Sequence, residues 1–282
     1  MIPEYIKKRI SYCEKDYEIF KNFLESHSVN TVCKNANCPN IYECFRKNYA
    51  SFMILGNICT RNCKFCSVNK GKPQPLDEKE PKKIAEVVKK FKMKYVVITS
   101  VTRDDLPDGG ALQFKKTVEE IKKISPQTKI ELLIPDFKGD ISILNIIFNS
   151  QPDVISHNIE TVKSLYPIIR PKANYETSLQ ILSEIKKAGF TTKSGFMIGL
   201  GETENEIYEI MNDILKTGCD ILVIGQYLKS SKNGYEVKKF YTEEFFKKLE
   251  NYGLQIGFKK IYAGIFYRTS YLADTFCQNY FD

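Results

Sequence analysis

Residues 52–66 read Phe-Met-Ile-Leu-Gly-Asn-Ile-Cys-Thr-Arg-Asn-Cys-Lys-Phe-Cys, a short apolar run followed by a loop with three cysteines. The run Phe52–Leu55 has the length and composition of a buried parallel strand. Cys59, Cys63 and Cys66 follow it with the spacing C-x3-C-x2-C. Three thiolates from one tight loop can hold three corners of a cubane cluster and leave one iron open, whereas structural zinc takes four ligands. The stretch predicts an iron–sulfur site after the first strand, with a zinc knuckle or unrelated thiols as the alternative.

Five more apolar runs repeat this strand pattern along the chain. They are Tyr95–Thr99, Ile130–Ile134, Val154–His157, Ser194–Gly199 and Ile221–Gly225. Segments with apolar residues at three- and four-residue steps predict helices at about 79–92, 111–124, 140–149, 174–188, 203–217 and 242–252. This alternation predicts a parallel α/β sheet with right-handed crossovers. Periodicity does not choose between a doubly wound sheet and a partial barrel, and both bind ligands at the carboxyl ends of their strands.

The chain of 282 residues, 43% of them hydrophobic, is long enough for one large α/β domain, and its length alone also permits two smaller domains. We expect an N-terminal extension over residues 1–50, a core over 51–252 and a C-terminal extension over 253–282. No window approaches the ~18 apolar residues of a membrane span, and the first residues show no leader. A cytoplasmic protein that does not enter the membrane is therefore expected.

Charge and cysteine content narrow the class of partner. The net charge of +8 comes from lysines spread along the chain in pairs, such as Lys82-Lys83 and Lys89-Lys90. Such pairs are typical of solvated helix faces, and they favour an acidic partner. No basic tract interleaved with aromatics is visible, so nucleic acid is not an expected partner. Nine cysteines without a secretory signal argue against a disulfide framework and favour metal binding.

A second cysteine group lies upstream of the first strand. Cys33, Cys38 and Cys44 follow the pattern C-x4-C-x5-C. A structural zinc ion needs a fourth ligand, for which His27 is the only nearby candidate in the sequence. Two groups of three cysteines predict two clusters.

The C-x3-C-x2-C loop resembles the signature of the radical S-adenosylmethionine (SAM) superfamily, in which an aromatic residue such as Phe65 typically precedes the third cysteine. The order of the two cysteine groups is similar to that of the lipoyl synthases. Further segments resemble that family between about residues 28 and 275: Thr99–Leu106, Asp108–Ala111, Leu133–Gly139, His157–Val162, Lys193–Met197, Gly199–Thr203 and Gly225–Leu228.

The resemblance implies a partial (β/α)6 TIM-type barrel with two 4Fe–4S clusters and SAM as cofactors. The open iron of the first cluster would chelate SAM, and an electron would cleave it to a 5′-deoxyadenosyl radical. Two such radicals would take hydrogen from the sixth and eighth carbons of an octanoyl chain on a carrier-domain lysine. Each carbon would then capture a sulfide of the second, auxiliary cluster, which makes the enzyme a sulfurtransferase.

The resemblance also assigns ligands. It implies Cys59, Cys63 and Cys66 for the first cluster, and Cys33, Cys38 and Cys44 with Ser270 for the auxiliary one. Ser270 belongs to Arg268-Thr269-Ser270-Tyr271, where the family usually has Arg-Ser-Ser-Tyr. A hydroxylate is a weak ligand for iron beside thiolates, which suits a cluster that is taken apart.

Polar residues near predicted strand ends are candidates for holding SAM: Ser100, Asp105, Asn158, Glu160, Arg170, Lys193 and Gln226. A salt-bridge or capping role is the alternative for each of them. Gly109-Gly110 fits either close backbone approach or a helix-entry turn. His157 is interpreted as a satisfied strand-end residue and Cys219 as a buried apolar one, while Cys277 is a candidate to compete with Ser270.

The family resemblance implies the partners as well. They are an octanoylated carrier (a lipoyl domain of a 2-oxoacid dehydrogenase or a glycine cleavage H protein), a low-potential donor such as ferredoxin or flavodoxin, and an iron–sulfur carrier for cluster repair; a monomer is expected. Residues 229–234, Ile265 and Leu272 depart from the usual family pattern of prolines and histidines. A diverged paralogue that sulfurates another chain is thus an alternative. A zinc-binding module for RNA or protein is an alternative of another class.

Overall fold

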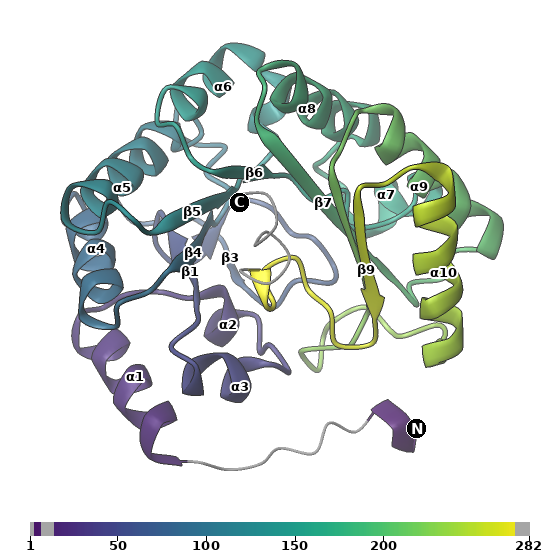
Figure 1. Ribbon diagram of the computed structural model, residues 1–282, viewed down its shortest axis with the longest axis horizontal. Helices are drawn as coiled ribbons and strands as arrows, with labels where there is room; N and C mark the ends of the chain where they lie inside the picture. Colours follow the sequence, from purple (N-terminus) through teal and green to yellow (C-terminus); the bar gives the residue numbers. More distant parts are fainter. Residues whose placement is uncertain (1–2, 7–13, 274–282) are drawn as a thin grey trace. The chain divides into compact units, whose positions relative to one another are not determined.

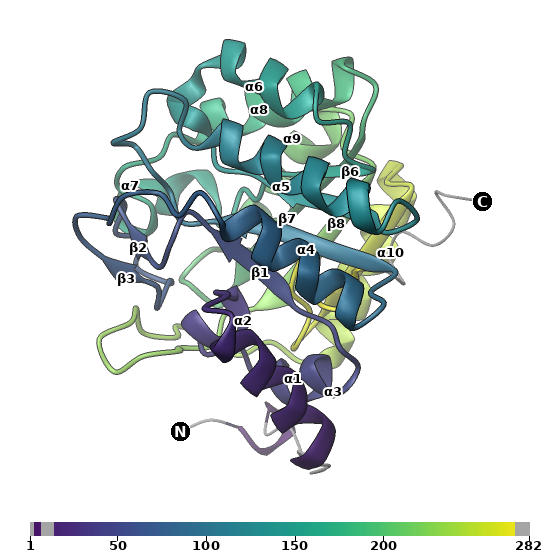
Figure 2. The same ribbon diagram turned by 90° about the vertical axis from the view of Figure 1, so that its left-hand side faces the viewer.

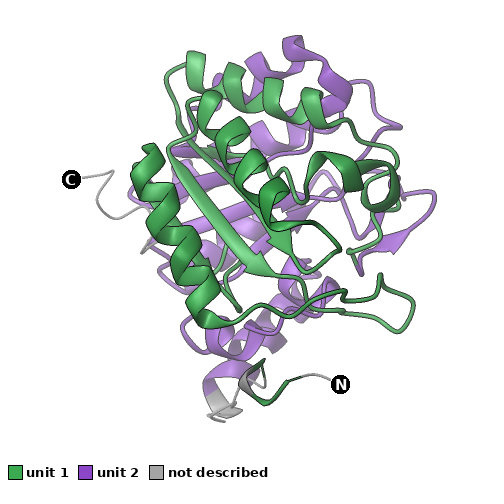
Figure 3. Ribbon diagram, turned by 90° about the vertical axis from the view of Figure 1, so that its right-hand side faces the viewer, with its two compact units in different colours: residues 1–9, 62–66, 155–271 green, residues 10–61, 67–154, 272–282 purple. Residues whose placement is uncertain are grey.

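A computed structural model describes residues 3–6 and 14–273. Cys13 and Cys277 lie outside the described residues, and so does the prediction that Cys277 competes as a ligand. The chain divides into two compact units, which are described separately (Figure 3). Unit 1 comprises residues 1–9, 62–66 and 155–271, and unit 2 comprises 10–61, 67–154 and 272–282.

Unit 2 contains the first strands of the series. Strands β1 (Ser51–Ile54), β4 (Tyr95–Ser100) and β5 (Lys129–Leu133) pair in parallel. Phe52 lies opposite Ile98, which lies opposite Leu132, and all three are fully buried. Helices α4 (Glu80–Lys90), α5 (Ala111–Ile124) and α6 (Ile141–Phe148) cover one face of these strands (Figure 1). Continuous apolar strands buried on both faces are typical of parallel α/β sheets.

Short elements complete unit 2. Helices α1 (Glu14–Ser26), α2 (Val32–Asn35) and α3 (Ile41–Arg46) precede β1 (Figure 2). The ring of Phe20 on α1 packs edge-to-face on Phe45 of α3, with centroids 5.1 Å apart. The two-residue strands β2 (Ile58–Cys59) and β3 (Asn69–Lys70) pair in parallel, and the 3-10 turn η2 spans Phe137–Gly139.

Unit 1 contains the later strands. Strands β7 (Thr191–Ile198), β8 (Ile221–Gln226) and β9 (Lys260–Gly264) pair in parallel and bury Leu222 and Ile224 in the core. Helices α8 (Tyr175–Lys187), α9 (Glu204–Lys216) and α10 (Glu243–Ile256) cover their outer face (Figure 1). The remaining elements are η1 (Glu4–Ile6), η3 (Lys163–Leu165) and α7 (Tyr166–Ile169). Strand β6 (Val154–Ser156) contains the boundary between the units.

The strand order is β1-β4-β5-β6-β7-β8-β9, so the main strands follow one another in sequence order. A doubly wound sheet reverses its strand order at a switch point, whereas a (β/α) barrel does not. The order therefore favours the partial barrel, and the six predicted strands correspond to β1 and β4–β8. Strand β9 was not predicted, because it lies in the segment assigned to an extension.

The helices follow the predicted ranges closely, with caps that explain their ends. In α9, Thr203 and Glu206 form a reciprocal capping box, which satisfies backbone donors that a helix start leaves free. Helix α10 continues past its predicted end at residue 252 because Gly253 packs on Ile261, where a Cβ would lie 2.4 Å from Cδ1. The helix ends instead at Gly257, whose φ of +115° suits glycine. Among the described helices, none is long and apolar enough to cross a bilayer.

Candidate active site

The loop that carries the first cysteine is joined to the end of β4 in unit 2. The Thr60 backbone N–H donates to the Thr102 carbonyl oxygen at 3.0 Å, and the Asp104 N–H donates to Thr60 Oγ1 at 3.1 Å. The Arg61 N–H points at Cys59 Sγ from 3.4 Å. Hydrogen bonds to ligand sulfurs tune the potential of iron–sulfur clusters. The backbone thus fixes the Cys59 thiol at the carboxyl end of the strands.

Arg61 is the best-anchored side chain of this loop. Its guanidinium makes two bonds of 2.6 Å to Asp136 and bonds of 2.8 and 2.9 Å to Asp104. Arg61 and Asp136 are almost fully buried, and Asp104 is 20% exposed. Burial alone would lower the pKa of Arg61, but hydrogen bonds and charge from both carboxylates raise it instead. The guanidinium therefore stays charged and ties the cysteine loop to the segments after β4 and β5.

The other two cysteines of the triplet belong to unit 1. The Lys64 N–H donates to the Ile169 carbonyl oxygen at 2.9 Å, and the Cys66 N–H donates to the Cys63 carbonyl oxygen at 3.2 Å. Phe65 packs on a small apolar cluster of Ile169, Leu200 and Tyr227. This packing gives the aromatic residue before the third cysteine a physical role, because it seats the turn that presents both thiols.

The donor set of the triplet fits a cluster with one open iron. Cys59, Cys63 and Cys66 form no disulfide and are partly exposed, so a group bound from solvent can reach them. Within the described residues, no three histidine, cysteine or acidic side chains converge on a point suited to a single metal ion. Thiolates that each bind a different iron of a cluster do not need such convergence.

Two short helices of unit 2 carry the second cysteine group. Cys33 lies on α2, which Thr31 caps by accepting a bond from the Lys34 N–H at 3.3 Å. The N–H of Cys38 donates to the Cys33 carbonyl oxygen at 3.0 Å, and Cys44 lies on α3. Burial raises the pKa of the Cys33 thiol to about 12, and the neighbouring Cys38 adds to the shift. A metal that displaces this proton gives a thiolate ligand, which fits the predicted auxiliary site.

Two of the predicted SAM residues lie at the carboxyl end of β4. Ser100 ends the strand, and its buried Oγ has no hydrogen-bond partner among the described residues. An orphaned buried hydroxyl at a strand end fits a group that binds a ligand. Asp105 instead pairs with Arg103 through bonds of 2.8 and 2.9 Å, which keeps the pKa of its carboxyl low. Asp105 therefore forms the salt bridge that the sequence left open as the alternative to SAM binding.

Glu80, which the sequence did not single out, holds the turn after β1. Its carboxylate accepts bonds from the N–H groups of Leu55 at 2.9 Å and Gly56 at 3.4 Å. Burial raises the pKa of this carboxyl, although those bonds oppose the shift. The pair Gly109-Gly110 is a helix-entry turn, and a Cβ on Gly110 would lie 2.3 Å from Leu55. The turn before the cysteine loop is therefore packed from two sides.

In unit 1, Asn158 joins the end of β6 to the segment that carries Ser270. Its amide donates to Glu160 at 3.1 Å and to Thr269 Oγ1 at 2.9 Å, while Thr269 Oγ1 lies 3.2 Å from Asn158 Oδ1. Burial raises the pKa of the Glu160 carboxyl, against the opposing charge of Arg170. The three predicted residues Asn158, Glu160 and Arg170 are therefore brought together.

The backbone around Ser270 is seated on the strands of unit 1. A Cβ on Gly225 of β8 would lie 2.3 Å from the Tyr267 carbonyl oxygen. Only glycine permits this close approach. A Cβ on Gly195 of β7 would touch Thr269 at 3.4 Å. Ser270 itself is partly buried in the turn that follows.

The other predicted residues of unit 1 are buried in the strands or directly after them. Lys193 is fully buried near the amino end of β7, and His157 is buried just after β6. The Gln226 side-chain NH2 donates to the carbonyl oxygens of Ile198, Tyr227 and Lys239, and the bond to Lys239 is 3.0 Å long. The Gln226 Oε1 accepts a hydrogen bond from the Tyr241 N–H. Cys219 is buried as expected, and burial raises the pKa of its thiol to about 12.

Glu202 is a further polar residue that the sequence did not single out. Its carboxylate accepts the backbone N–H groups of Gly199, Leu200 and Gly201 at 2.6 to 3.1 Å. The Tyr241 hydroxyl donates to the same carboxylate at 3.1 Å. Glu202 therefore fixes the loop after β7.

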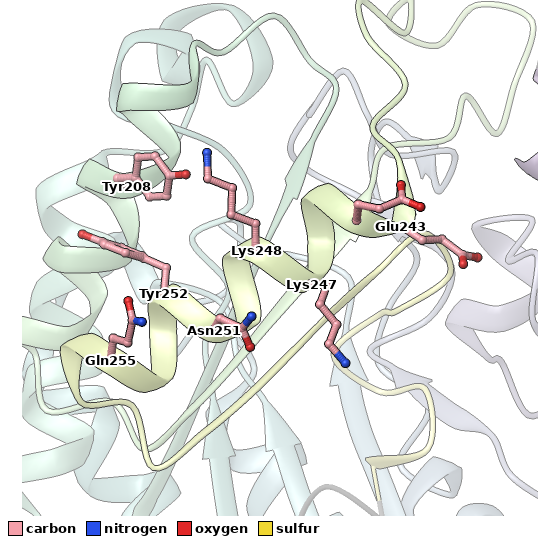
Figure 4. A pocket seen from close by; sticks show the side chains of 8 residues that line it. Tyr208, Glu243, Lys247, Lys248, Asn251, Tyr252 and Gln255 are labelled. Atoms are coloured by element: carbon pink, nitrogen blue, oxygen red, sulfur yellow. The ribbon is translucent and has the colours of Figure 1, made fainter.

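Two surface hollows of about 630 Å³ each lie outside these residues. One lies on α10 of unit 1, where Lys248 lies near the Tyr208 ring (Figure 4). Lys248 also pairs with Glu204 at 2.5 Å. The other lies beside α1 and α2 of unit 2. Neither is lined by a predicted site residue.

Known proteins are similar to this chain in sequence. The family model described as the radical SAM superfamily matches residues 53–214. Lipoyl synthases of Caldanaerobacter subterraneus subsp. tengcongensis and Caldicellulosiruptor saccharolyticus are each 49% identical over 96% of this chain and cover 95% and 96% of their own lengths. That of Bacteroides thetaiotaomicron is 44% identical. The chain belongs to the lipoyl synthase family.

Solved structures support the fold. Methylornithine synthase (PylB) matches with a TM-score of 0.56 and 14% identity, over 86% of this chain and 69% of its own. Streptococcus suis SuiB bound to S-adenosylmethionine matches with a TM-score of 0.60 and 13% identity, over 89% and 56%. The partial TIM-type barrel is thereby confirmed. Membership of the lipoyl synthase family also gives the chain its cofactors, SAM and 4Fe–4S clusters.

Proposed function

We propose that this chain inserts two sulfur atoms, at the sixth and eighth carbons, into an octanoyl group carried on a protein lysine. The observation that carries the proposal is the near full-length identity with lipoyl synthases, combined with both cysteine groups and a seated Arg268–Tyr271 segment. When bound, the first cluster supplies the electron that turns SAM into a hydrogen-abstracting radical. The chain's own residues must hold the reactants and exclude water.

The proposed ligands form two sets. Cys59, Cys63 and Cys66 hold the first cluster. Cys33, Cys38, Cys44 and Ser270 hold the auxiliary cluster, which is a substrate because its sulfide ends in the product. Thiolates bind iron more strongly than a hydroxyl does, so Ser270 would be the weakest of these four ligands and would favour release of its iron when the cluster gives up sulfide.

SAM is assigned to polar groups at strand ends. Ser100 offers a buried hydroxyl without a described partner, and Asn158 with Glu160 offers an amide and a carboxylate suited to ribose hydroxyls. Arg170 positions this pair, because its guanidinium donates to the Asn158 and Ile159 carbonyl oxygens at 3.2 and 3.1 Å. Asp105 would act through Arg103, and Gln226 through the Lys239 carbonyl oxygen that its amide holds. Lys193 remains a prediction.

The proposed partners are a lipoyl domain of a 2-oxoacid dehydrogenase or a glycine cleavage H protein, a ferredoxin or flavodoxin, and an iron–sulfur carrier that repairs the auxiliary cluster. We also propose that the chain acts as a monomer in the cytoplasm. The ranges 1–50, 51–252 and 253–282 remain predictions for its extensions and core.

The proposed reaction is tested with an octanoylated carrier domain. Anaerobically reconstituted protein, SAM and a reductant are expected to give a carrier carrying two added sulfurs, measured by mass spectrometry. If SAM is cleaved but the octanoyl chain gains no sulfur, the substrate assignment is wrong. Sulfur added to another acyl chain in a parallel incubation would then favour the diverged paralogue. Residues 229–234 suggest this alternative because they depart from the usual family pattern.

Replacing Thr269 with valine is expected to weaken SAM binding about 2- to 10-fold, because the Asn158 amide loses a hydrogen bond worth ~0.5–1.5 kcal/mol. Isothermal titration of SAM into the reconstituted protein measures the change. Thr269→Ser keeps the hydroxyl and is the matched control, expected to bind as the parent does. Equal binding by all three proteins would remove Asn158 from the SAM site.

A further inference from the structure

The segment between β8 and α10, residues 227–240, is a loop of unit 1 (light green in Figure 2). Its base is fixed by backbone and side-chain bonds. The Lys238 N–H donates to the Gly199 carbonyl oxygen at 2.8 Å, and the Gln226 amide holds the Lys239 carbonyl oxygen at 3.0 Å. These hydrogen bonds anchor the base of the loop to the ends of β7 and β8.

The inner side of this loop is joined to the segment that carries Cys63 and Cys66. The Tyr235 N–H donates to the Lys64 carbonyl oxygen at 3.1 Å, and the Tyr227 hydroxyl donates to the Tyr235 carbonyl oxygen at 2.8 Å. Tyr235 and Val237 pack on the same apolar cluster as Phe65. Because of these contacts, the loop borders the place where the radical is made.

The outer side of the loop is basic. Residues 229–239 contain four lysines and one glutamate. Lys229 pairs with Glu236, whereas Lys232, Lys238 and Lys239 are exposed and form no ion pair with a described carboxylate. Lys238 and Lys239 lie over the rings of Tyr235 and Tyr241, at 5.4 and 4.5 Å from the centroids. Three lysines that pair with no described carboxylate thus lie on a loop whose base is hydrogen-bonded.

We infer that the outer side of this loop, the basic loop, is the docking surface for an acidic face of the octanoylated carrier domain. The inference rests on the proposed function. A lysine-borne acyl chain must enter the site while its carrier domain stays outside, so the domain meets the residues that border the cluster segment. Charges at the rim of such an interface mainly raise the association rate and set the register.

A protein fits the basic loop better than a nucleic acid does. Single-stranded nucleic acid is bound by exposed aromatic faces on which bases stack. The Tyr235 ring instead packs on the apolar cluster under the loop, and Lys238 lies over it. Complementary charge without stacking surfaces favours a folded acidic domain.

The test is a charge reversal in the basic loop, Lys232→Glu with Lys238→Glu. The matched control is Lys187→Glu with Lys216→Glu, which makes the same change in net charge. Those two lysines are exposed at the carboxyl ends of α8 and α9, which lie toward the amino ends of the strands. Each variant is reconstituted and given two substrates, the octanoylated carrier domain and a short octanoyl-lysine peptide without acidic residues.

For the loop variant, we expect an association rate with the carrier domain about tenfold lower at low salt, with a matching rise in KM. The difference is expected to shrink at high salt, because exposed charges are screened. The KM for the peptide, the reductive cleavage of SAM and the behaviour of the control variant are expected to be unchanged.

The inference is wrong if the loop variant has the parent's KM for the carrier, or if the control variant shows an equal rise in that KM. It is also wrong if the loop variant shows an equal rise in KM for the peptide, because the loop would then act on the site itself. Loss of RNA binding with intact carrier binding would assign the loop to nucleic acid. The proposed function is tested separately, because a parent protein that adds sulfur to neither the peptide nor the carrier would refute it. In that case the binding of the carrier to the two variants would still test the basic loop.

Discussion

Arg61→Leu is expected to lower the free energy of unfolding by about 3–5 kcal/mol, because it leaves the buried Asp136 and the partly buried Asp104 without their cation. Asp136 is 2% exposed and Asp104 is 20% exposed, and both face the same guanidinium. Without it, two negative charges remain close together in a medium that solvates them poorly. Urea denaturation of the cluster-free protein measures the loss.

Arg61→Lys is the matched control, since it keeps one positive charge but cannot make four bonds in a planar fork. It should fall between the two proteins. A leucine variant as stable as the parent at neutral pH would mean that Arg61 does not hold this loop.

The local parts of the fold could be predicted from the sequence because their signals are local. Apolar runs and helical periodicity located β1, β4–β8 and helices such as α5 and α9. Strand β9 was missed because its burial alternates and its segment follows the last predicted helix. The continuation of α10 through Gly253 was missed because a glycine usually ends a helix, and only its contact with Ile261 explains the exception.

The site could be predicted where a motif concentrates its chemistry, as in the two cysteine groups. The residues that hold those groups in place were missed because their partners are distant in sequence. Arg61 bonds to Asp104 and Asp136, which are 43 and 75 positions away. One signal could have paired them, since all three follow strands whose carboxyl ends share an edge. Glu80 and Glu202 bind backbone N–H groups. Such partners cannot be predicted from residue types, because every residue except proline has a backbone N–H.

Cys63→Ala and Cys38→Ala are expected to separate the two halves of the reaction. Each substitution removes one thiolate from a different group, so each protein should lose about half of its iron. Cys63→Ala should reduce SAM cleavage to background, because the cluster proposed to bind SAM is the one assigned to Cys63. Cys38→Ala should still cleave SAM while adding no sulfur to the octanoyl chain. Iron counting, 5′-deoxyadenosine yield and carrier mass give the three readouts.

Cys219→Ala is the control for this pair, because its thiol is buried between β7 and β8 and lies in neither group. It should retain the full iron content and both activities. The decisive comparison is Cys38→Ala, since a sulfur donor outside the chain would leave its product unchanged. Sulfurated carrier from that variant would refute the auxiliary cluster as the source of sulfur, and Cys63→Ala would still report on the radical site. The two cysteine groups are therefore independently testable, as expected if one cluster generates the radical and the other is consumed by it.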